Sequence, residues 1–244
     1  MPDAPGLARA AAEMLREEIE GVLATRDRVA VALSGGATPR LFFRLLGAEY
    51  RDNIKWRAVH LFWADERAVP PDHEQSNFRS VSEELLSKIT LPPGNVHRIP
   101  GELAPEQAAA AYEADLQRYF GGAGLPEFDL IFLGVGEDGH TASLFPGAAA
   151  LAEKERLAVA VDHTTTASWR VTLTLPVLNN ASRVVFLVAG RSKTQIVRAI
   201  LTAEGEDKHP AGLIKPRRGT VVWLLDQEAA AGLPGASKIP LSES

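Results

Sequence analysis

Apolar side chains recur at helical spacing between residues 7 and 24, with charged residues on the opposite face. The apolar positions of this segment are Leu7, Ala11, Met14, Leu15, Ile19, Val22 and Leu23. This pattern predicts an amphipathic helix that buries one side against a core. We expect further helices over residues 38–46, 78–88, 105–120 and 192–201, with Pro39 in the first turn of its helix.

Short apolar runs between these helices predict buried strands. They cover residues 28–33, 58–63, 128–133, 157–161, 170–175, 183–188 and 220–225. Near-continuous apolar strands that alternate with helices are typical of a parallel sheet that is covered on both faces. We therefore expect an α/β, Rossmann-like fold with a largely parallel sheet and helices on both faces. The length of 244 residues fits a single domain over residues 1–244, with ligands at the carboxyl ends of the strands.

Composition and charge narrow the classes of partner. The formal net charge is -5 and no dense run of Lys and Arg is present, so the counterion release that drives nucleic-acid binding is missing. The chain has no cysteine, which excludes disulfides and thiol catalysis and fits a reducing compartment. The first residues lack the pattern of a secretory signal, and no apolar run reaches the ~18 residues of a membrane span. We expect a cytoplasmic protein with no nucleic-acid or membrane partner.

A glycine-rich segment, residues 134–147, follows the apolar run 128–133 and presents Glu137, Asp138 and His140 within four residues. Packing does not require such a concentration of acid and base groups, so this segment is a candidate active site. Imidazole is the side chain that changes charge nearest neutral pH, and a neighbouring carboxylate can fix its tautomer. The alternative is a turn histidine that is merely hydrogen-bonded to nearby backbone.

The same segment contains the spacing G-x-G-x-x-G in Gly134, Gly136 and Gly139, which raises the possibility of a dinucleotide site. Two acidic residues would then lie inside the loop that must receive a pyrophosphate, and Pro146 ends any following helix early. These features argue against a nucleotide, and we expect no cofactor.

A second loop, Ser34-Gly35-Gly36-Ala37-Thr38-Pro39, stands between a predicted strand and a predicted helix. Free backbone N–H groups and the helix dipole make such a junction an anion site, and two glycines allow close approach. The sequence therefore predicts a phosphate site. Two alternatives are a plain tight turn with Thr38 as N-cap and an esterase elbow with Ser34 as nucleophile. The second lacks the first glycine of G-x-S-x-G, because Ala32 stands there.

Charged residues Asp65, Glu66 and Arg67 follow the strand 58–63, so they too fall at a carboxyl end. Such a run is commonly a solvated loop, although Arg67 could clamp a substrate oxygen or stabilise an oxyanion. The segment Ser76-Asn77-Phe78-Arg79 is interpreted as an N-cap and first helical turn.

Two further cations are candidates for an anion site, Arg170 in a strand and Lys193 at the start of a helix. Lysine at a helix N-terminus is unfavourable for the dipole, so an anion partner would explain it. A solvated lysine is the ordinary alternative. The six histidines make no spacing typical of metal ligands, and we expect no metal.

Taken together, residues 34–39, 65–67, 76–79 and 134–147 resemble the motif series of the 6-phosphogluconolactonase family in order and spacing. The wider superfamily, which includes glucosamine-6-phosphate deaminase/isomerase, is similar in its phosphate loop and in its histidine motif. After the histidine the deaminases typically continue Ile-Ala-Phe-Asn-Glu-Pro, whereas this chain reads Thr141-Ala142-Ser143-Leu144-Phe145-Pro146. That difference favours the lactonase.

The resemblance implies a glucosamine-6-phosphate isomerase-like fold and hydrolysis of 6-phospho-D-glucono-1,5-lactone in the oxidative pentose phosphate pathway, with no metal or cofactor. It also implies a base, His140, and a phosphate site. The residues implied for the phosphate are Ser34, Gly35, Gly36 and Thr38, with Arg170 and Lys193. We expect Asp138 to orient the imidazole, and either Arg67 or a backbone N–H of residues 136–139 to stabilise the oxyanion. We also expect Asp65 to be one of the catalytic residues.

Two alternatives stay open at this point, a sugar-phosphate deaminase/isomerase and a non-catalytic sugar-phosphate sensor. A sensor usually carries an added DNA-binding segment, and this sequence has no basic helix-turn-helix-like extension. The expected partner is a small sugar phosphate, and the expected oligomeric state is a monomer.

Overall fold

Six parallel strands form the central sheet in the order β4-β2-β1-β5-β8-β9. The computed structural model describes residues 1–122, 124–163, 168–202 and 209–234. The six strands are β1 (Val29–Leu33), β2 (Val59–Trp63), β4 (Val96–His97), β5 (Leu130–Leu133), β8 (Arg183–Val188) and β9 (Thr220–Leu225). All but the short β4 match predicted apolar runs. The predicted α/β fold with a parallel sheet is confirmed.

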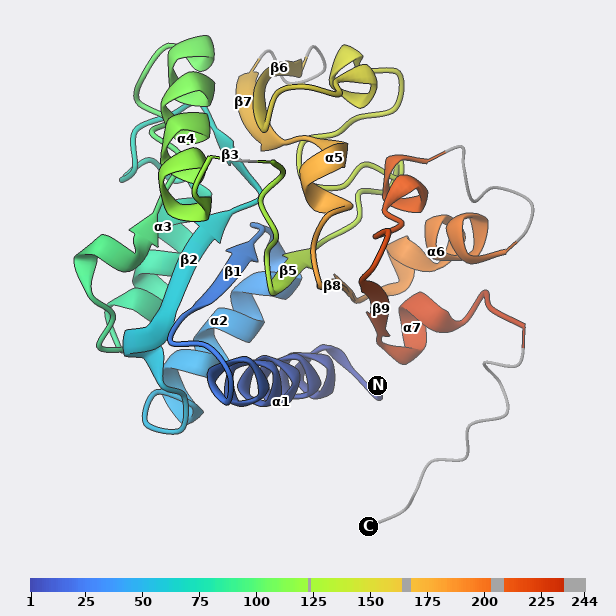
Figure 1. Cartoon of the computed structure of the whole chain (residues 1–244). Coiled ribbons are helices and arrows are strands. Elements are labelled where there is room, and N and C mark those ends of the chain that lie inside the picture. Colours follow the sequence, from blue (N-terminus) through green and yellow to red (C-terminus); the bar gives the residue numbers. More distant parts are fainter. Residues whose placement is uncertain (123, 164–167, 203–208, 235–244) are drawn as a thin grey trace.

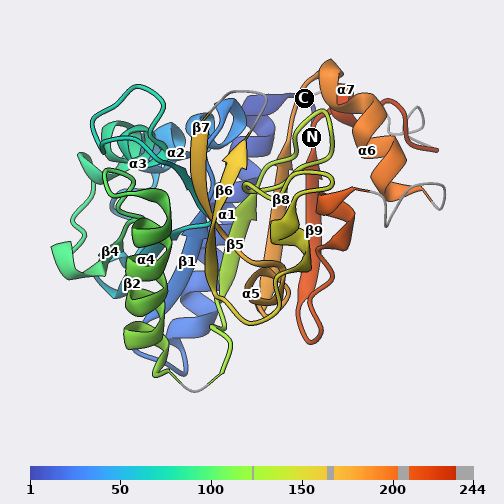
Figure 2. The same cartoon turned by 90° about the horizontal axis from the view of Figure 1, so that it is seen from above.

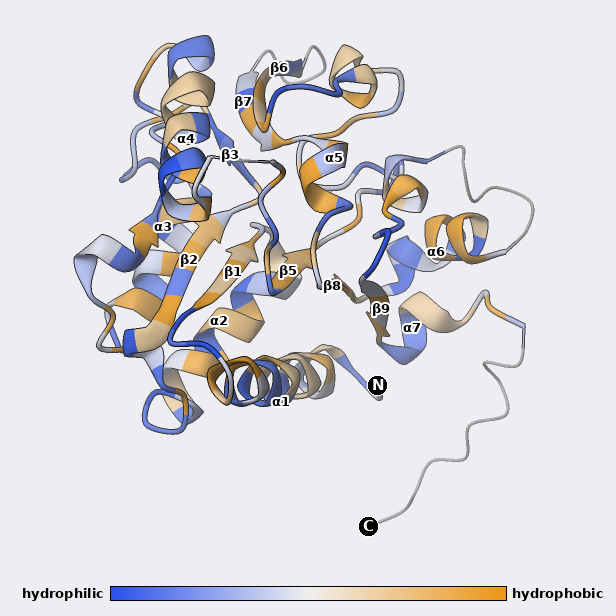
Figure 3. Cartoon of the chain, in the orientation of Figure 1, coloured by the Kyte–Doolittle hydropathy of each residue, from blue (hydrophilic) through white to orange (hydrophobic). Residues whose placement is uncertain are grey.

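Helices α1 (Ala4–Leu23) and α2 (Ala37–Glu49) lie together on one side of this sheet (Figure 1). The helix predicted over residues 7–24 begins earlier because the Asp3 side chain accepts the Gly6 N–H and Pro5 lies in the first turn. Buried Leu7, Leu15 and Ile19 face the core. The central strands β1 and β5 are apolar along their length in Figure 3, as is typical of strands covered on both faces.

The other side of the sheet is covered by α4 (Pro105–Phe120), by α5 (Leu175–Leu178) and by a second, three-stranded sheet (Figure 1). This small sheet is antiparallel, in the order β3-β7-β6. Its strands are β3 (Asp65–Arg67), β6 (Ala158–His163) and β7 (Ser168–Leu173). The runs 157–161 and 170–175 are therefore strands, as expected, but they do not join the parallel sheet. The charged run 65–67 is a strand and not a loop.

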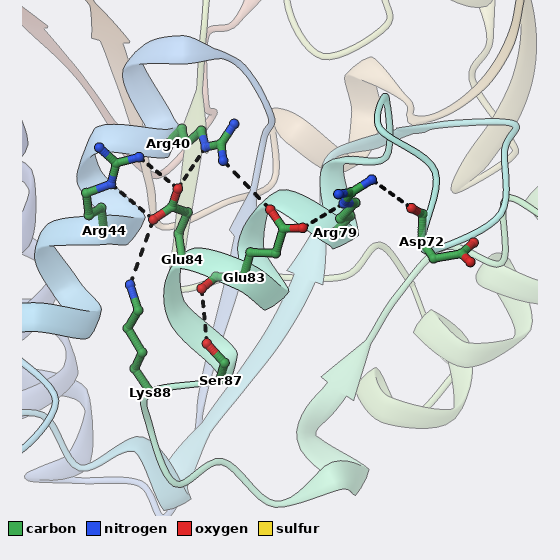
Figure 4. Close-up of polar contacts among 8 residues, drawn as sticks. All are labelled: Arg40, Arg44, Asp72, Arg79, Glu83, Glu84, Ser87 and Lys88. Atoms are coloured by element: carbon green, nitrogen blue, oxygen red, sulfur yellow. Dashed lines mark hydrogen bonds and ion pairs between the residues drawn. The ribbon is translucent and has the colours of Figure 1, made fainter.

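The helix predicted over residues 78–88 is divided in two. It consists of α3 (Asn77–Val81), which has Ser76 as N-cap, and a π-helical turn, η2 (Ser82–Leu86). The turn η2 brings Glu84 under Arg40 and Arg44 of α2, and these ion pairs join the two elements (Figure 4).

The remaining elements are short. They are η1 (Trp56–Ala58), η3 (Pro93–Asn95), η4 (Ala149–Ala152), η5 (Arg191–Lys193), α6 (Thr194–Leu201), η7 (Pro210–Leu213) and α7 (Gln227–Ala230). The helix predicted over residues 192–201 therefore begins within the 3₁₀ turn η5 and continues as α6. Seen from above (Figure 2), the start of α2, the loop after β5 and the start of α6 gather at one edge of the sheet. This edge holds the carboxyl ends of the strands, where ligands of such sheets bind.

Candidate active site

A cleft of about 410 Å³ opens at the carboxyl ends of the parallel strands. Its walls come from segments that follow β1, β2, β5 and β8, and from β7 of the small sheet. The cleft brings together nine of the ten predicted site residues, namely Ser34, Gly35, Gly36, Thr38, Asp65, Arg67, His140, Arg170 and Lys193. The tenth, Asp138, lies behind His140 and is bonded to its ring.

The loop between β1 and α2 forms one wall of the cleft. Gly36 is the N-cap of α2 at φ +119°, which strongly favours glycine, and no side chain caps the helix. Thr38 lies inside the first turn, so the alternative that makes Thr38 the N-cap is wrong. Ser34 is 4% exposed, and its Oγ has no hydrogen-bond partner among the described residues. Uncapped N–H groups, a helix dipole and a free hydroxyl together make an anion site.

Asn77 shapes this loop from the side, a role that the N-cap interpretation of residues 76–79 missed. Its Nδ2 donates to the Asp65 carbonyl oxygen at 2.9 Å and lies 3.4 Å from Asp65 Oδ1. A Cβ on Gly35 would stand 1.8 Å from Asn77 Oδ1. The glycine is therefore required by the amide that packs against it. The available signal in the sequence was a polar residue, Asn77, at the start of a predicted helix.

Glu66 is the residue of β3 that faces away from the cleft. Its carboxylate accepts the backbone N–H groups of Arg67, Asn77 and Phe78 and the hydroxyl of Ser76, all within 3.1 Å. Burial raises the pKa of Glu66, although the donated N–H groups act in the opposite direction. Glu66 thus fastens the start of α3 to β3 and positions Asn77.

Asp65 lies on the cleft side of β3 and is itself buried. Ser143 Oγ donates to Asp65 Oδ2 at 2.7 Å, and the Ser143 side chain is fully buried. This hydrogen bond connects the glycine-rich segment, residues 134–147, to β3. Sequence reasoning singled out neither Ser143 nor this bond, because nothing local distinguishes Ser143 from other turn serines.

Two arginines face each other across the small sheet, since Arg67 of β3 pairs in register with Arg170 of β7. The Nε atom of each is buried and has no hydrogen-bond partner within the described part of the chain. Burial, followed by the charge of Arg67, lowers the pKa of Arg170. Like charges directly opposite on neighbouring strands are destabilising on their own. An anion in the cleft would remove that repulsion.

His140 and Asp138 form a hydrogen-bonded pair at the centre of the glycine-rich turn. His140 Nδ1 lies 2.6 Å from Asp138 Oδ1, which also accepts the His140 backbone N–H at 3.1 Å. Burial acts to raise the pKa of Asp138, but the bonds and charge of His140 outweigh it and lower that pKa. An ionised Asp138 accepts from Nδ1–H, so Nε2 carries the free lone pair. The interpretation as a histidine bonded only to backbone is wrong.

Glycine at position 136 makes room for this pair, because a Cβ there would lie 2.1 Å from His140 Nδ1. The Gly136 N–H donates to the His140 carbonyl oxygen at 2.8 Å, and the Gly139 N–H donates to the Gly136 carbonyl oxygen at 3.0 Å. These two N–H groups are therefore engaged inside the turn. Of the oxyanion donors suggested by the sequence, Arg67 is the one that lines the cleft with a charged side chain.

Lys193 closes the far wall, at the end of η5 and directly before α6. In the preceding turn, the Gly190 N–H donates a hydrogen bond to the carboxylate of Asp226 at 2.9 Å, which stabilises the turn. Lys193 thus stands at the start of a helix and on the cleft, as the sequence predicts. Within the described ranges, no group of three or more His, Asp and Glu side chains could hold a metal ion. No helix in that same part of the chain is both long and apolar enough to cross a membrane.

Known proteins resemble this chain over nearly its whole length. A sequence model of the family described as "Glucosamine-6-phosphate isomerases/6-phosphogluconolactonase" matches residues 2–223. The 6-phosphogluconolactonase of Synechocystis sp. is 41% identical over 219 residues, which are 88% of this chain and 89% of that protein. The human 6-phosphogluconolactonase is 38% identical over 92% of this chain and 88% of that protein. The solved structure of the Trypanosoma brucei 6-phosphogluconolactonase has a TM-score of 0.84 at 31% identity and covers 96% of this chain and 97% of that chain. The chain therefore belongs to the glucosamine-6-phosphate isomerase/6-phosphogluconolactonase family.

Proposed function

We propose that this protein hydrolyses 6-phospho-D-glucono-1,5-lactone to 6-phospho-D-gluconate, the second step of the oxidative pentose phosphate pathway. The observation that carries the proposal is the 2.6 Å pair of His140 Nδ1 and Asp138 Oδ1, next to a cleft that also holds an uncapped helix start and three cations. One cleft thus offers a base for a water molecule and a separate site for a phosphate. The names of the relatives at 38% and 41% identity support the same substrate.

The phosphate is assigned to the start of α2. The backbone N–H groups of Gly36 and its neighbours, the hydroxyls of Ser34 and Thr38, and the charge of Lys193 face the same volume. Arg170 extends this positive surface toward the reacting end. Binding the remote phosphate holds C1 of the lactone near His140, so that binding energy is used for orientation.

The reaction is assigned to His140 acting on water. His140 Nε2 removes a proton from water as the oxygen attacks C1, and the carbonyl becomes an oxyanion. The tetrahedral intermediate then collapses with cleavage of the bond between C1 and the ring oxygen. The imidazolium returns its proton to that oxygen, which becomes the C5 hydroxyl. Asp138 keeps the imidazole in one tautomer and stabilises its charged form.

Arg67 is proposed as the donor to the oxyanion, because it lines the cleft with a charged side chain. Two of the alternative backbone donors, the N–H groups of Gly136 and Gly139, are engaged within the turn. Its Nη1 atom donates to the Gln75 carbonyl oxygen at 2.7 Å, which leaves other guanidinium donors for substrate. Asp65, held by Ser143, is proposed to accept a hydrogen bond from a sugar hydroxyl.

Acid release separates this function from its alternatives. A pH-stat assay on freshly made phosphogluconolactone, with a no-enzyme control for spontaneous hydrolysis, is expected to record faster acid production with the protein. Incubation with glucosamine 6-phosphate is expected to release no ammonia. Ammonia without accelerated acid release would instead support the deaminase/isomerase, and binding without turnover of either compound would support the sensor. The single domain, the monomeric state and the cytoplasmic location stay predictions, and sedimentation velocity tests the monomer.

A further inference from the structure

The turn that carries His140 is held from outside by a distant segment around η7. The Ala211 N–H donates to the Gly139 carbonyl oxygen at 3.0 Å. His209 Nδ1 lies 3.3 Å from the carbonyl oxygen of Asp138, from which it is separated by 71 positions in the chain. Both contacts reach the two residues that directly precede His140.

The imidazole of His209 also packs against the backbone of Gly139. Gly139 has φ +85°, and a Cβ built there would lie 2.6 Å from His209 Nδ1 and 2.7 Å from its Cβ and Cγ. The ring therefore occupies the space that a side chain at position 139 would need. The separation of 3.3 Å from Nδ1 to the carbonyl is long for a hydrogen bond, whereas the ring lies directly against the backbone of Gly139.

The turn has few backbone hydrogen bonds of its own. Its internal backbone bonds are those from Gly136 N–H to His140 and from Gly139 N–H to Gly136. Glycine in two of its positions gives the turn more conformational freedom than other residues would, and that freedom must be lost when the turn is ordered. The His140 ring packs on Phe145, with the ring centroids 4.7 Å apart, and the Asp138 carboxylate fixes which nitrogen it presents to the cleft.

We propose that His209 is a positioning residue for His140. Its ring packs on Gly139 and thereby keeps the Asp138 carboxylate aligned with the imidazole. This inference rests on the proposed function in so far as it concerns turnover. The phosphate site is formed mainly by the loop between β1 and α2, with Lys193 and Arg170, and the contacts of His209 and Ala211 described above reach residues 138 and 139 instead. We therefore expect His209 to affect kcat and to leave KM nearly unchanged.

Two substitutions separate ring packing from the nitrogen contact. We expect His209→Ala to lower kcat about tenfold, because a small misplacement of a catalytic group has effects of that order, while KM changes less than about twofold. His209→Leu keeps an apolar group on Gly139 and is expected to retain kcat to within about twofold. Equal losses in both variants would overturn the proposal, and so would an unchanged kcat in His209→Ala.

Asn179→Ala is the matched control, because Asn179 holds the other end of the same segment. Its Nδ2 donates to the Leu213 carbonyl oxygen at 2.9 Å, and its Oδ1 accepts the Lys215 N–H at 2.6 Å. We expect Asn179→Ala to lower the melting temperature without the selective loss of kcat. A loss of kcat as large as that of His209→Ala would mean that any loosening of the segment suffices, and would contradict a specific role for His209.

A spectroscopic readout tests the proposal even if the lactonase assignment fails. In ¹⁵N-correlated spectra of the imidazole, His140 of the wild type is expected in the tautomer with a proton on Nδ1. His209→Ala is expected to give a mixture of tautomers, with the wild-type signal kept in His209→Leu. An unchanged tautomer in folded His209→Ala overturns the positioning role. A wild type without lactonase activity contradicts only the proposed function.

Discussion

Glu84 gives the most quantitative prediction, because its largely buried carboxylate forms ion pairs with three cationic side chains. Its side chain is 9% exposed and accepts hydrogen bonds from Arg40 Nε at 2.8 Å and from Arg44 Nη2 at 2.9 Å (Figure 4). Lys88 Nζ lies 3.8 Å away. The hydrogen bond from Arg44 is the largest cause that lowers the pKa of Glu84 from 4.5 to about 2, with Arg40 adding to it and burial opposing it.

The pKa shift sets the free energy and the pH range of the effect. A fall from 4.5 to about 2 corresponds to about 3 kcal/mol at 1.36 kcal/mol per unit. Arg40 and Arg44 are 50% and 57% exposed, so solvent screening reduces the expected contribution to about 1–2 kcal/mol. Because the folded-state pKa is depressed, this stabilisation is fully present above pH 4.5 and is lost as the pH falls toward 2.

Urea unfolding at several pH values measures this contribution. We expect Glu84→Gln to lower the free energy of unfolding by about 1–2 kcal/mol at pH 7, and the difference from wild type to shrink between pH 4.5 and 3. Glu83→Gln is the matched control, because Glu83 is 46% exposed and forms surface ion pairs with Arg79 and Arg40. It is expected to cost less than about 0.5 kcal/mol. A difference for Glu84→Gln that stays constant from pH 7 to pH 3 would refute the reasoning.

Three further predictions concern the site and one remote histidine. His140→Ala is expected to lower kcat by about 10²–10⁴-fold with phosphate binding retained, whereas Lys193→Ala chiefly raises KM; similar effects on both constants in both variants would contradict this division of roles. Gly35→Ala places a Cβ against Asn77 and should lower kcat/KM by about tenfold or more, and unchanged kinetics would show that the loop adapts. Burial lowers the pKa of His60 to about 4, so its contribution to stability is full above about pH 6.5 and is lost toward pH 4; an NMR titration midpoint near the ordinary value would disprove this.

The buried strands were the part of the fold that hydrophobicity alone could predict. β1 and β5 are buried at every position, and the predicted run 183–188 coincides with β8. A strand that is covered on both faces is apolar throughout, so its sequence pattern by itself indicates that the strand is buried. The charged strand β3 has no such pattern, and it exists because β7 pairs with it.

The chemistry of the site divides in the same way. His140 and Asp138 are two positions apart, so the sequence could suggest their pairing before the distance of 2.6 Å was known. The bond between Asp65 and Ser143 joins residues 78 positions apart. No local pattern indicates that these two side chains meet.

The sequence by itself determined the alternation of strands and helices, the glycine-rich turns at strand ends and the residue types available for catalysis, because each depends on neighbours within a few positions. Only the tertiary structure decided that Asn77 packs against Gly35 and that Arg67 faces Arg170. These contacts join segments that are separate in the chain. The first contact depends on how the start of α3 packs beside the loop between β1 and α2, and the second on the register of β3 with β7. No single segment encodes either.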